Sequence, residues 1–380
     1  MRTCRTFGRI ALALVVAGAA GPAASGAEWT AAAPGYGWSF PRDHWAHRDY
    51  RVEWWYVTGH LDAVGDAGRR FGFQFTIFRV GLHPGPLPFE SDWTASHLVM
   101  GHAAITDEAA GRHVFSEVLH RETPLLGGFA AWPDPQIAWC RGPAGTASGW
   151  SLRWNGTAFD FSMRDDAQGL AFELATRPSK PAVLQGPAGY SRKSAEPDGA
   201  ASQYYSFTRL VTEGSLALEG RTHAVRGESW MDHEFSTSSL SDRQVGWDWF
   251  SLQLDDGREI MLYALRRADG SVDFAWGTLV GAEGRARYLP AGEWSVRART
   301  SWTSRRTGAE YPARWTVELP GAGLALDVRP LVAGQENVST RTGGLHYWEG
   351  AVRVFDGGGR AIGRGYVELT GYGAGSRPPV

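Results

Sequence analysis

The strongest candidate for chemistry in this sequence is a run of three ionisable residues, Asp232-His233-Glu234. Large aromatic residues, Trp230 and Phe235, enclose the run. Burying carboxyl and imidazole groups among such side chains is costly unless the groups are paired or used in a reaction. Because carboxyl and imidazole groups can give and take protons, the run predicts a general acid–base site.

The secondary structure around this run decides which of its side chains can act together. In a β-strand, Asp232 and Glu234 share one face, and His233 points to the other. A β-bulge, or the end of the strand, would still let all three line one cavity. The alternative is a structural polar cluster where two domains meet, and the sequence leaves both interpretations open.

A second aromatic segment, Trp247-Asp248-Trp249-Phe250, adds another acidic candidate. Asp248 is a candidate catalytic residue, but it precedes paired aromatic residues in the same way as Glu53 does. This symmetric placement favours a structural role for both acids. Aromatic residues near the acidic candidates are expected to contact a ligand: Trp54, Tyr204, Tyr205, Trp230, Trp249 and Tyr347.

The histidine residues elsewhere in the chain do not predict a metal site. A zinc site needs three or four side chains that converge at about 2 Å. The histidines concerned are His44, His47, His60, His97 and His102. They form no such set, because His97 and His102 are expected to face opposite sides of the sheet. The sequence contains no HExxH, G-x-S-x-G, G-x-G-x-x-G or P-loop motif. We therefore expect neither a metal nor a cofactor.

The first 27 residues have the features of a cleaved secretory signal peptide. Three arginines precede a short apolar stretch, and Ser25-Gly26-Ala27 supplies the small residues before the cleavage site. No transmembrane segment is expected after cleavage, so we predict a soluble secreted or periplasmic protein. Removing three of the 38 basic residues leaves 35 against 40 acidic residues, which gives no basic surface for nucleic acid.

The composition favours large β-sheets. At 380 residues the chain is long enough for two domains. Its 18 Trp and 49 Gly residues, with few helix signals, are typical of sheets that enclose apolar cavities. Cys140 is the only cysteine after residue 27, so no internal disulfide is expected.

Short strands must position the candidate residues. In residues 51–61 (RVEWWYVTGHL) and 71–79 (FGFQFTIFR), side chains alternate in a way that predicts a hairpin. Residues 28–45 are expected to form an irregular arm over a barrel end, and residues 177–201 a long functional loop. Further strands are predicted at 96–107, 114–119, 150–154, 159–163, 170–175, 204–210 and 216–235.

The second half of the chain repeats landmarks of the first half in the same order. Glu53-Trp54-Trp55 matches Asp248-Trp249-Phe250, and Tyr204-Tyr205-Ser206 matches Tyr347-Trp348-Glu349. The position that corresponds to Asp232-His233-Glu234 is Glu368-Leu369-Thr370, which lacks the ionisable triplet. The repeat predicts two tandem β-barrels, in residues 28–238 and 239–380, after a signal peptide in residues 1–27.

With these motifs, the chain resembles the AttH family of lipocalin-like secreted proteins, which are related to the carotenoid 1,2-hydratases. The stretches that carry the resemblance span most of the sequence after residue 27: EWWYVTGHL, FGFQFTIFR, MGHAAITD, GYSRKS, YYSFTRL, SWMDHEF, GWDWFSLQLDDGREIMLYALR, YWEGAV and GRGYVELTGY. The resemblance implies two lipocalin-like barrels side by side and a link to ABC-type export systems of the cell envelope. Because carotenoid hydratases usually lack a secretory signal, the chain is more similar to the AttH branch.

The resemblance implies hydration of an isoprenoid alkene or a hydrolase-like reaction on a lipid-like molecule. A carboxyl group whose pKa is raised by an apolar pocket can protonate an alkene, and aromatic faces can stabilise the carbocation. Asp232, His233, Glu234 and Asp248 are the candidates for these proton transfers. The alternative function is a non-enzymatic carrier of a hydrophobic small molecule that serves an ABC exporter.

Overall fold

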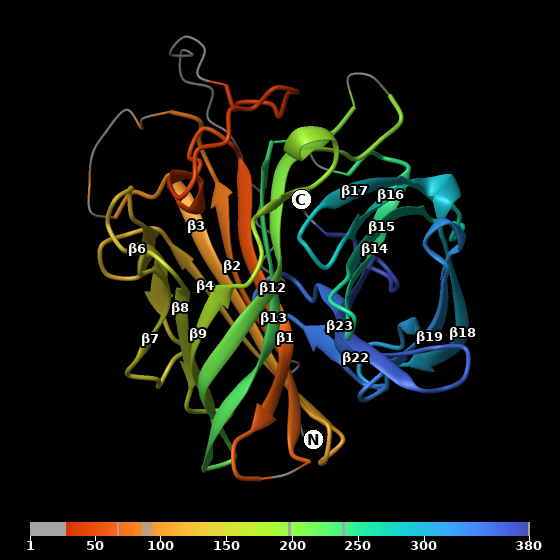
Figure 1. The fold of residues 1–380 in the computed structure, drawn as a ribbon. Coiled ribbons are helices and arrows are strands. Elements are labelled where there is room, and N and C mark those ends of the chain that lie inside the picture. The colour runs from red at the N-terminus through yellow and green to blue at the C-terminus, as the bar shows by residue number, and fades with distance from the viewer. Residues whose placement is uncertain are drawn as a thin grey trace, which may run out of the picture.

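The computed structural model describes residues 28–378, apart from 67, 86, 88–90, 92, 197–198 and 238–239. The described residues form two curled antiparallel sheets that lie side by side as lipocalin-like barrels (Figure 1). The predicted all-β fold with two tandem barrels is therefore confirmed. The predicted signal peptide, residues 1–27, and the predicted boundary between residues 238 and 239 lie outside the described residues.

Barrel one contains the strands from the first half of the chain. They are β1 (Val52–Ala63), β2 (Arg70–Gly81), β3 (His97–Asp107), β4 (Arg112–Arg121), β5 (Gly127–Phe129), β6 (Gln136–Arg141), β7 (Gly149–Trp154), β8 (Phe159–Asp165), β9 (Leu170–Pro178), β10 (Val183–Leu184), β11 (Tyr190–Arg192), β12 (Ala201–Leu218) and β13 (Arg221–Ser236). Their order in the sheet is β4-β3-β2-β1-β13-β12-β9-β8-β7-β6-β5, and β10 and β11 pair with β12.

Barrel two contains the remaining strands. They are β14 (Gln244–Leu254), β15 (Glu259–Arg267), β16 (Val272–Val280), β17 (Ala286–Pro290), β18 (Ser295–Thr303), β19 (Glu310–Leu319), β20 (Leu324–Pro330), β21 (Glu336–Val338), β22 (His346–Phe355) and β23 (Ala361–Thr370). Their order is β17-β16-β15-β14-β23-β22-β20-β19-β18, and β21 pairs with β22. The order β3-β2-β1-β13-β12-β9 of barrel one thus recurs as β16-β15-β14-β23-β22-β20, which is the repeat that the sequence predicts.

Side-chain alternation explains why these segments form strands with two different faces. On β2, Phe71, Phe73, Phe75 and Ile77 are fully buried in the core of barrel one. The residues between them, such as Gln74, point to the opposite face. In ordinary barrels that outer face is solvated, but here part of it packs against the second barrel, where a separate aromatic cluster forms.

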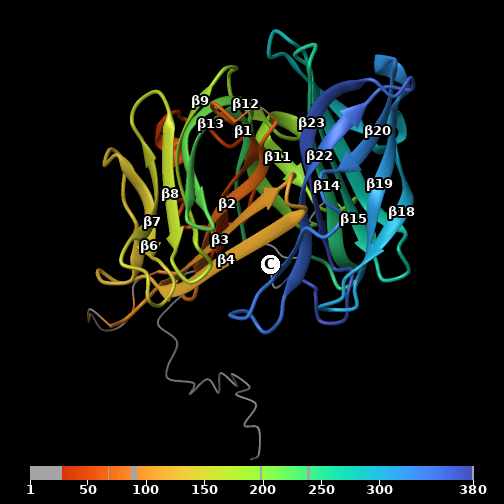
Figure 2. The same ribbon diagram turned by 90° about the horizontal axis from the view of Figure 1, so that it is seen from below.

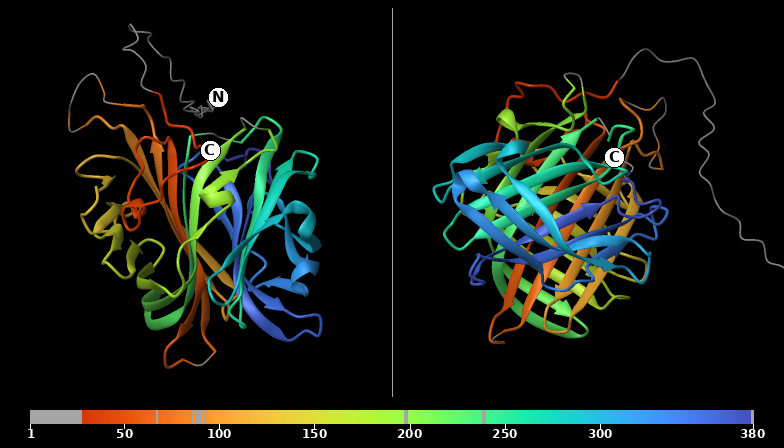
Figure 3. Two further views of the ribbon diagram at one scale, coloured as in Figure 1. Left: turned by 45° about the horizontal axis from the view of Figure 1, so that its top comes forward. Right: turned by 90° about the vertical axis from the view of Figure 1, so that its right-hand side faces the viewer.

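The two barrels approach each other closely along β1, β2, β22 and β23, as the view from below shows (Figure 2). A Cβ atom at Gly72 would lie 2.3 Å from the Cβ atom of Ala351, so only glycine permits this approach. Two cations from barrel one bind a buried carboxylate of barrel two. Lys180 Nζ lies 2.8 Å from Glu259 Oε2, and Arg209 Nε lies 2.7 Å from Glu259 Oε1. These contacts fix the barrels side by side (Figure 3).

Residues 28–51, which include the predicted irregular arm of residues 28–45, precede the first strand and pack over one end of barrel one. Trp38 Nε1 donates to the Ala188 carbonyl at 3.1 Å, and Trp45 Nε1 donates to the Asp134 carbonyl at 2.8 Å. None of the helices in the described residues is long and apolar enough to cross a membrane. These helices are the 3-10 turns η1 (Arg42–His44), η2 (Pro187–Gly189), η3 (Ala291–Glu293) and η4 (Pro320–Ala322).

Candidate functional site

A pocket of about 110 Å³ lies between the two barrels. Both barrels supply its walls, mainly from β1, β12 and β13 of the first and β14, β22 and β23 of the second. Aromatic residues make up half of the lining, and three carboxyl groups and one ammonium group face them. The lining residues are Val52, Trp54, Tyr56, Gln74, Phe78, Lys193, Tyr204, Asp232, Glu234, Ser236, Leu240, Trp247, Trp249, Tyr263, Tyr347 and Glu368.

The strand β13 divides the predicted Asp232-His233-Glu234 triplet between two environments. β13 pairs with β1 in unbroken register from Val225 to Ser236, so no bulge interrupts the alternation of its side chains. Asp232 and Glu234 line the pocket. His233 points to the other face and is fully buried inside barrel one. The strand interpretation of the triplet therefore holds, and the three side chains do not share one cavity.

The internal repeat places a second carboxyl group opposite this part of β13. Asp232 pairs with Ser206 on β12. In barrel two, Glu368 on β23 pairs with Glu349 on β22, and Glu349 matches Ser206 in the sequence repeat. Glu368 is therefore the counterpart of Asp232. Because both strands face the junction of the barrels, the repeat brings both carboxyl groups into one pocket.

The aromatic walls of the pocket follow the same repeat. Asp232 also pairs with Tyr56 on β1, and Glu368 pairs with Trp249 on β14. These registers match Tyr56 with Trp249 and, two residues earlier, Trp54 with Trp247. They do not match Glu53 with Asp248, so the predicted equivalence of those two acids is wrong by two residues. Four corresponding pairs thus line the pocket: Trp54 and Trp247, Tyr56 and Trp249, Tyr204 and Tyr347, and Asp232 and Glu368.

Asp232 is a buried carboxyl group that accepts hydrogen bonds and lacks a cationic partner among the described residues. Ser206 Oγ donates to Asp232 Oδ1 at 2.5 Å, and Trp230 Nε1 donates to the same oxygen at 2.7 Å. The Tyr204 hydroxyl also hydrogen-bonds to this carboxyl group. Burial nevertheless outweighs these donors and raises the pKa of Asp232 to about 7.

Glu368 has fewer donors. Trp247 Nε1 donates to its Oε2 at 2.9 Å. Burial and the nearby carboxyl groups of Asp232 and Glu234 raise the pKa of Glu368 to about 7. Its cross-strand neighbour Glu349 accepts a hydrogen bond from Tyr56, and burial holds the pKa of Glu349 well above its ordinary value. Burial therefore favours the protonated form of Glu349.

Glu234 differs from the other pocket acids because it has a cationic partner. Lys193 Nζ lies 2.5 Å from Glu234 Oε1, and the Ser202 hydroxyl donates to the same oxygen. The ammonium group of Lys193 also lies 4.6 Å from the centre of the Tyr263 ring, within the range of a cation–π contact. The charges of Lys193 and Glu234 neutralise each other. Asp232 and Glu368 are therefore the pocket groups that are available for proton transfer.

The arrangement is suited to proton transfer without a cofactor. Two carboxyl groups with pKa values about 7 face one apolar cavity, so near neutral pH one can hold a proton while the other is ionised. The charge of Asp232 is one cause of the raised pKa of Glu368. Buried acids with raised pKa values are unfavourable for stability at neutral pH, and such sites are typical of function.

We expect the pocket acids to make the fold less stable as the pH rises. A carboxyl group whose pKa is higher in the folded state stabilises the fold at acid pH, and this contribution is lost as the pH rises through about 7. The free energy of unfolding, measured by urea denaturation, should therefore fall between pH 5 and pH 8. Glu368→Gln should recover roughly 2 kcal/mol at pH 8 and little at pH 5. An equal effect at both pH values would contradict the raised pKa.

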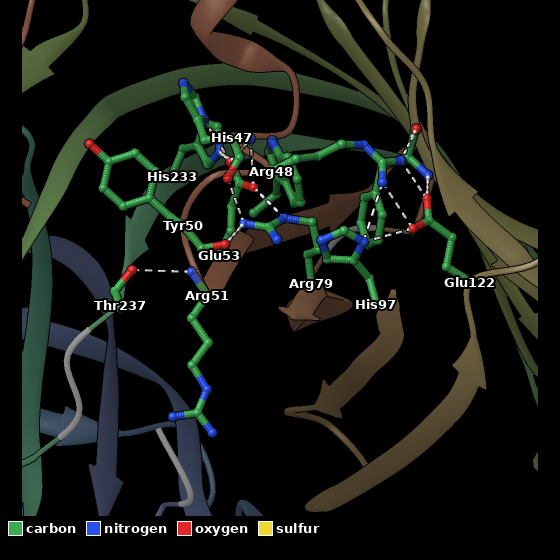
Figure 4. Close-up of polar contacts among 12 residues, drawn as sticks. His47, Arg48, Tyr50, Arg51, Glu53, Arg79, His97, Glu122, His233 and Thr237 are labelled. Atoms are coloured by element: carbon green, nitrogen blue, oxygen red, sulfur yellow. Dashed lines mark hydrogen bonds and ion pairs between the residues drawn. The ribbon is translucent and has the colours of Figure 1, made fainter. Parts of the chain in front are cut away.

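His233 belongs to a polar network inside barrel one (Figure 4). Its Nε2 lies 2.8 Å from Glu53 Oε1, and His47 Nδ1 lies 2.7 Å from the same oxygen. Arg79 Nε donates to Glu53 Oε2 at 2.8 Å, and Tyr205 OH lies 3.0 Å from His233 Nδ1. Most members of the network come from β1, β2, β12 and β13, so it joins four strands at the end of the barrel that the arm covers.

The charges within this network are balanced. Burial opposes ionisation of Glu53, but Arg79 and His47 hold the pKa of Glu53 well below its ordinary value. Glu53 in turn raises the pKa of His47 against the effect of burial, whereas burial lowers the pKa of His233. Glu53, His47 and His233 have the donor types of a metal site and lie within 4.8 Å of one another. Their ligand atoms already bind each other, and the Arg79 cation lies against the same carboxylate, which favours a structural role.

The structure places six of the ten predicted site residues in the pocket and four elsewhere. The six are Trp54, Tyr204, Asp232, Glu234, Trp249 and Tyr347. Trp230 lies behind Asp232 as a hydrogen-bond donor, and His233 and Tyr205 belong to the network in barrel one. Asp248 lies in barrel two, where it binds Arg266 Nε at 2.7 Å and accepts a hydrogen bond from Tyr372.

The main pocket residues that sequence reasoning missed are Glu368 and Lys193. The repeat places Glu368 at the position of the triplet, but Glu368 is not among the predicted acids of the site. The repeat contained this signal, because two barrels that pack through equivalent strands bring equivalent residues together. Lys193 lies in the segment 177–201, which was predicted to be functional without a particular residue.

The fold and the pocket together define a two-barrel, lipocalin-like protein with an acidic and aromatic cavity between its barrels. The chain belongs to the AttH-like family, whose model matches residues 31–372. It is 31% identical to the crystal structure of an AttH protein from Nitrosomonas europaea, with a TM-score of 0.77, and the match covers 90% of this chain and 99% of that one.

More distant structures share the fold alone. Kievitone hydratase from Nectria haematococca is 13% identical with a TM-score of 0.62, and the match covers 90% of this chain and 95% of that one. CghA in complex with Sch210972 is 12% identical with a TM-score of 0.50, and the match covers 86% and 89% of the two chains. No functionally curated protein matches the chain.

Proposed function

We propose that this protein is a cofactor-independent hydratase that adds water to a carbon–carbon double bond of a hydrophobic, isoprenoid-like small molecule. The observation that carries the proposal is the pair of carboxyl groups, Asp232 and Glu368, with pKa values about 7 in one aromatic pocket. Hydration needs one acid and one base within reach of the same ligand, and it needs no metal or redox group. The shared fold of kievitone hydratase is consistent with this chemistry.

The hydrogen bonds of the two carboxyl groups suggest how they divide the reaction. Three donors surround Asp232, from Ser206, Trp230 and Tyr204, and they stabilise its ionised form. Glu368 has one donor, from Trp247, so its ionised form is less stabilised. We assign the protonated form to Glu368, as the general acid, and the ionised form to Asp232, as the general base.

In this mechanism the π electrons of the alkene take the proton of Glu368, which forms a C–H bond and leaves a carbocation and the Glu368 carboxylate. The oxygen of a water molecule then bonds to the cationic carbon, and Asp232 takes the proton that this water releases. Proton exchange between Asp232 and Glu368 through solvent restores the starting state. The sum is alkene plus water giving an alcohol, and the reverse sequence gives dehydration.

The aromatic walls of the pocket supply the other requirement, which is stabilisation of the carbocation. The rings of Trp54, Trp247 and Trp249 line the cavity with Tyr204. An aromatic face near a cation contributes about 0.5–2 kcal/mol, and more where water is excluded.

The test is incubation of the protein with prenylated phenols, linear isoprenoid alcohols and polyenes, followed by mass spectrometry. We expect a product heavier by one water from an alkene with a trisubstituted end. In D₂O the product should carry one deuterium on carbon, delivered by Glu368. Cleavage of ester substrates with no hydration of any alkene would contradict the proposal.

The competing proposal is a non-enzymatic carrier that serves an ABC exporter of the cell envelope. A carrier needs an apolar cavity whose ionisable groups are all balanced, as the pair of Lys193 and Glu234 is. Asp232 and Glu368 have no such partner among the described residues, which favours the enzyme. Export to the periplasm or the medium stays a prediction from residues 1–27, and a fusion to alkaline phosphatase would test it.

A further inference from the structure

A larger, apolar chamber of about 300 Å³ adjoins the pocket between the barrels. Pocket and chamber share wall residues, among them Trp54, Phe78, Trp247 and Tyr347, so they lie directly next to each other. Together the two volumes reach the size of ordinary small-molecule sites. The double bond that reacts needs only the space next to Asp232 and Glu368.

The chamber exists because the outer face of barrel one is apolar where it approaches barrel two. On β3, Val99 and Ala103 point into the core of barrel one, whereas Leu98 and Met100 point outward and line the chamber. Leu119 on β4 and Leu345 near the start of β22 complete this apolar lining. All four outward leucine and methionine side chains are only half-buried, so a ligand could still cover their surface.

The lining also contains polar residues, and one of them, His102, has an unused hydrogen-bonding atom. His102 is 1% exposed, and its Nδ1 lies 2.7 Å from the hydroxyl of Tyr347. Its Nε2 is buried and has no hydrogen-bond partner among the described residues. The rings of Phe78 and Phe115 pack against the edge of the imidazole and hold it in place.

An unpaired nitrogen in an apolar cavity is unfavourable, and a ligand can remove this cost. Burial lowers the pKa of His102 to about 4, so the imidazole is neutral at pH 7 and carries one proton. Its Nε2 is then either a donor or an acceptor, depending on the bond between Nδ1 and Tyr347. A hydroxyl group can both donate and accept, so it satisfies Nε2 in either form.

We propose that the chamber binds the chain of the substrate and that His102 binds a hydroxyl group of that chain. This inference rests on the proposed function, because it places the reacting double bond at Asp232 and Glu368. The substrate class is then an isoprenoid alcohol, in which an apolar chain separates the alkene that reacts from the hydroxyl that is recognised. His102 is a specificity residue and takes no part in the proton transfers.

The test compares farnesol with farnesene, a hydrocarbon of the same chain length that lacks the hydroxyl. Binding is followed by quenching of tryptophan fluorescence, and the preference is the ratio of the two Kd values in each variant. His102→Phe should reduce the preference for farnesol about tenfold, because the buried hydroxyl loses its partner. His102→Gln, whose amide can reach the position of Nε2, should keep most of the preference. An unchanged ratio in His102→Phe would overturn the assignment.

A second variant tests the chamber itself. Met100→Trp fills the chamber and should weaken the binding of farnesol and farnesene alike by tenfold or more. Its melting temperature and that of His102→Phe must match that of the parent protein within a few degrees. Unchanged binding of both probes would show that the chain lies elsewhere. These binding measurements need no turnover. They therefore test the chamber and His102 even if the protein hydrates no alkene.

Discussion

Replacing either pocket acid should abolish turnover while leaving the fold intact. We expect Asp232→Asn and Glu368→Gln each to lower kcat by a factor of about 10³ or more, since each removes one partner of the proton transfers. Both replacements keep the shape of the side chain, so the Kd for a bound isoprenoid should change less than about threefold. Single-turnover kinetics and fluorescence titration of each variant provide these two measurements.

The matched control for this prediction is Glu234→Gln. Glu234 lies on the same face of β13 and lines the same pocket, but Lys193 already balances its charge. We expect this variant to keep most of its turnover and to lose some affinity or stability instead. If Glu234→Gln were as inactive as Asp232→Asn, the division of roles between the pocket acids would be wrong.

The largest effect on stability should come from the network inside barrel one. Glu53→Ala leaves the guanidinium group of Arg79, which is fully buried, without its carboxylate. Breaking a buried pair by removing one partner costs about 3–5 kcal/mol. Urea denaturation, followed by the near-ultraviolet signal of the tryptophans in barrel one, should show a loss of that size.

The double replacement Glu53→Gln with Arg79→Met separates the charge effect from the loss of packing. Removing both charges should restore at least half of the stability that Glu53→Ala loses, because no unpaired charge is left. The network lies on the opposite face of β13 from the pocket acids, so the double variant should leave Asp232 and Glu368 in place, although Glu53 and Arg79 also line the chamber. A loss of stability below about 1 kcal/mol in Glu53→Ala would contradict the structural role.

Much of the fold was predictable because its signals are local or repeated. The alternation in residues 71–79 shows which face of β2 is buried, and the parity of Asp232, His233 and Glu234 predicts their separation. The motif Tyr204-Tyr205-Ser206 and its match at Tyr347 indicate the tandem barrels. These patterns require no knowledge of which strands are neighbours.

The complete site was harder to predict because it depends on strand register and on how the barrels pack. Matching Glu53 with Asp248 by their aromatic neighbours shifts β14 by two residues, and this shift conceals the correspondence of Trp54 with Trp247. The sequence also cannot show that the outer face of barrel one, with His102, is covered by barrel two. Glu368 becomes part of the site only through that packing.

The central claim is that Asp232 and Glu368 share a pocket and titrate near neutral pH. Infrared difference spectroscopy of the carboxyl groups, as a function of pH, tests it most directly in the parent protein and in the two variants. We predict two buried carboxyl groups that titrate at about pH 7, and each substitution should remove one of them. Asp232→Asn should also lower the pKa of Glu368, because a neighbouring negative charge is lost. If both groups titrate near pH 4 and neither substitution affects the other group, the pocket contains no acid–base pair.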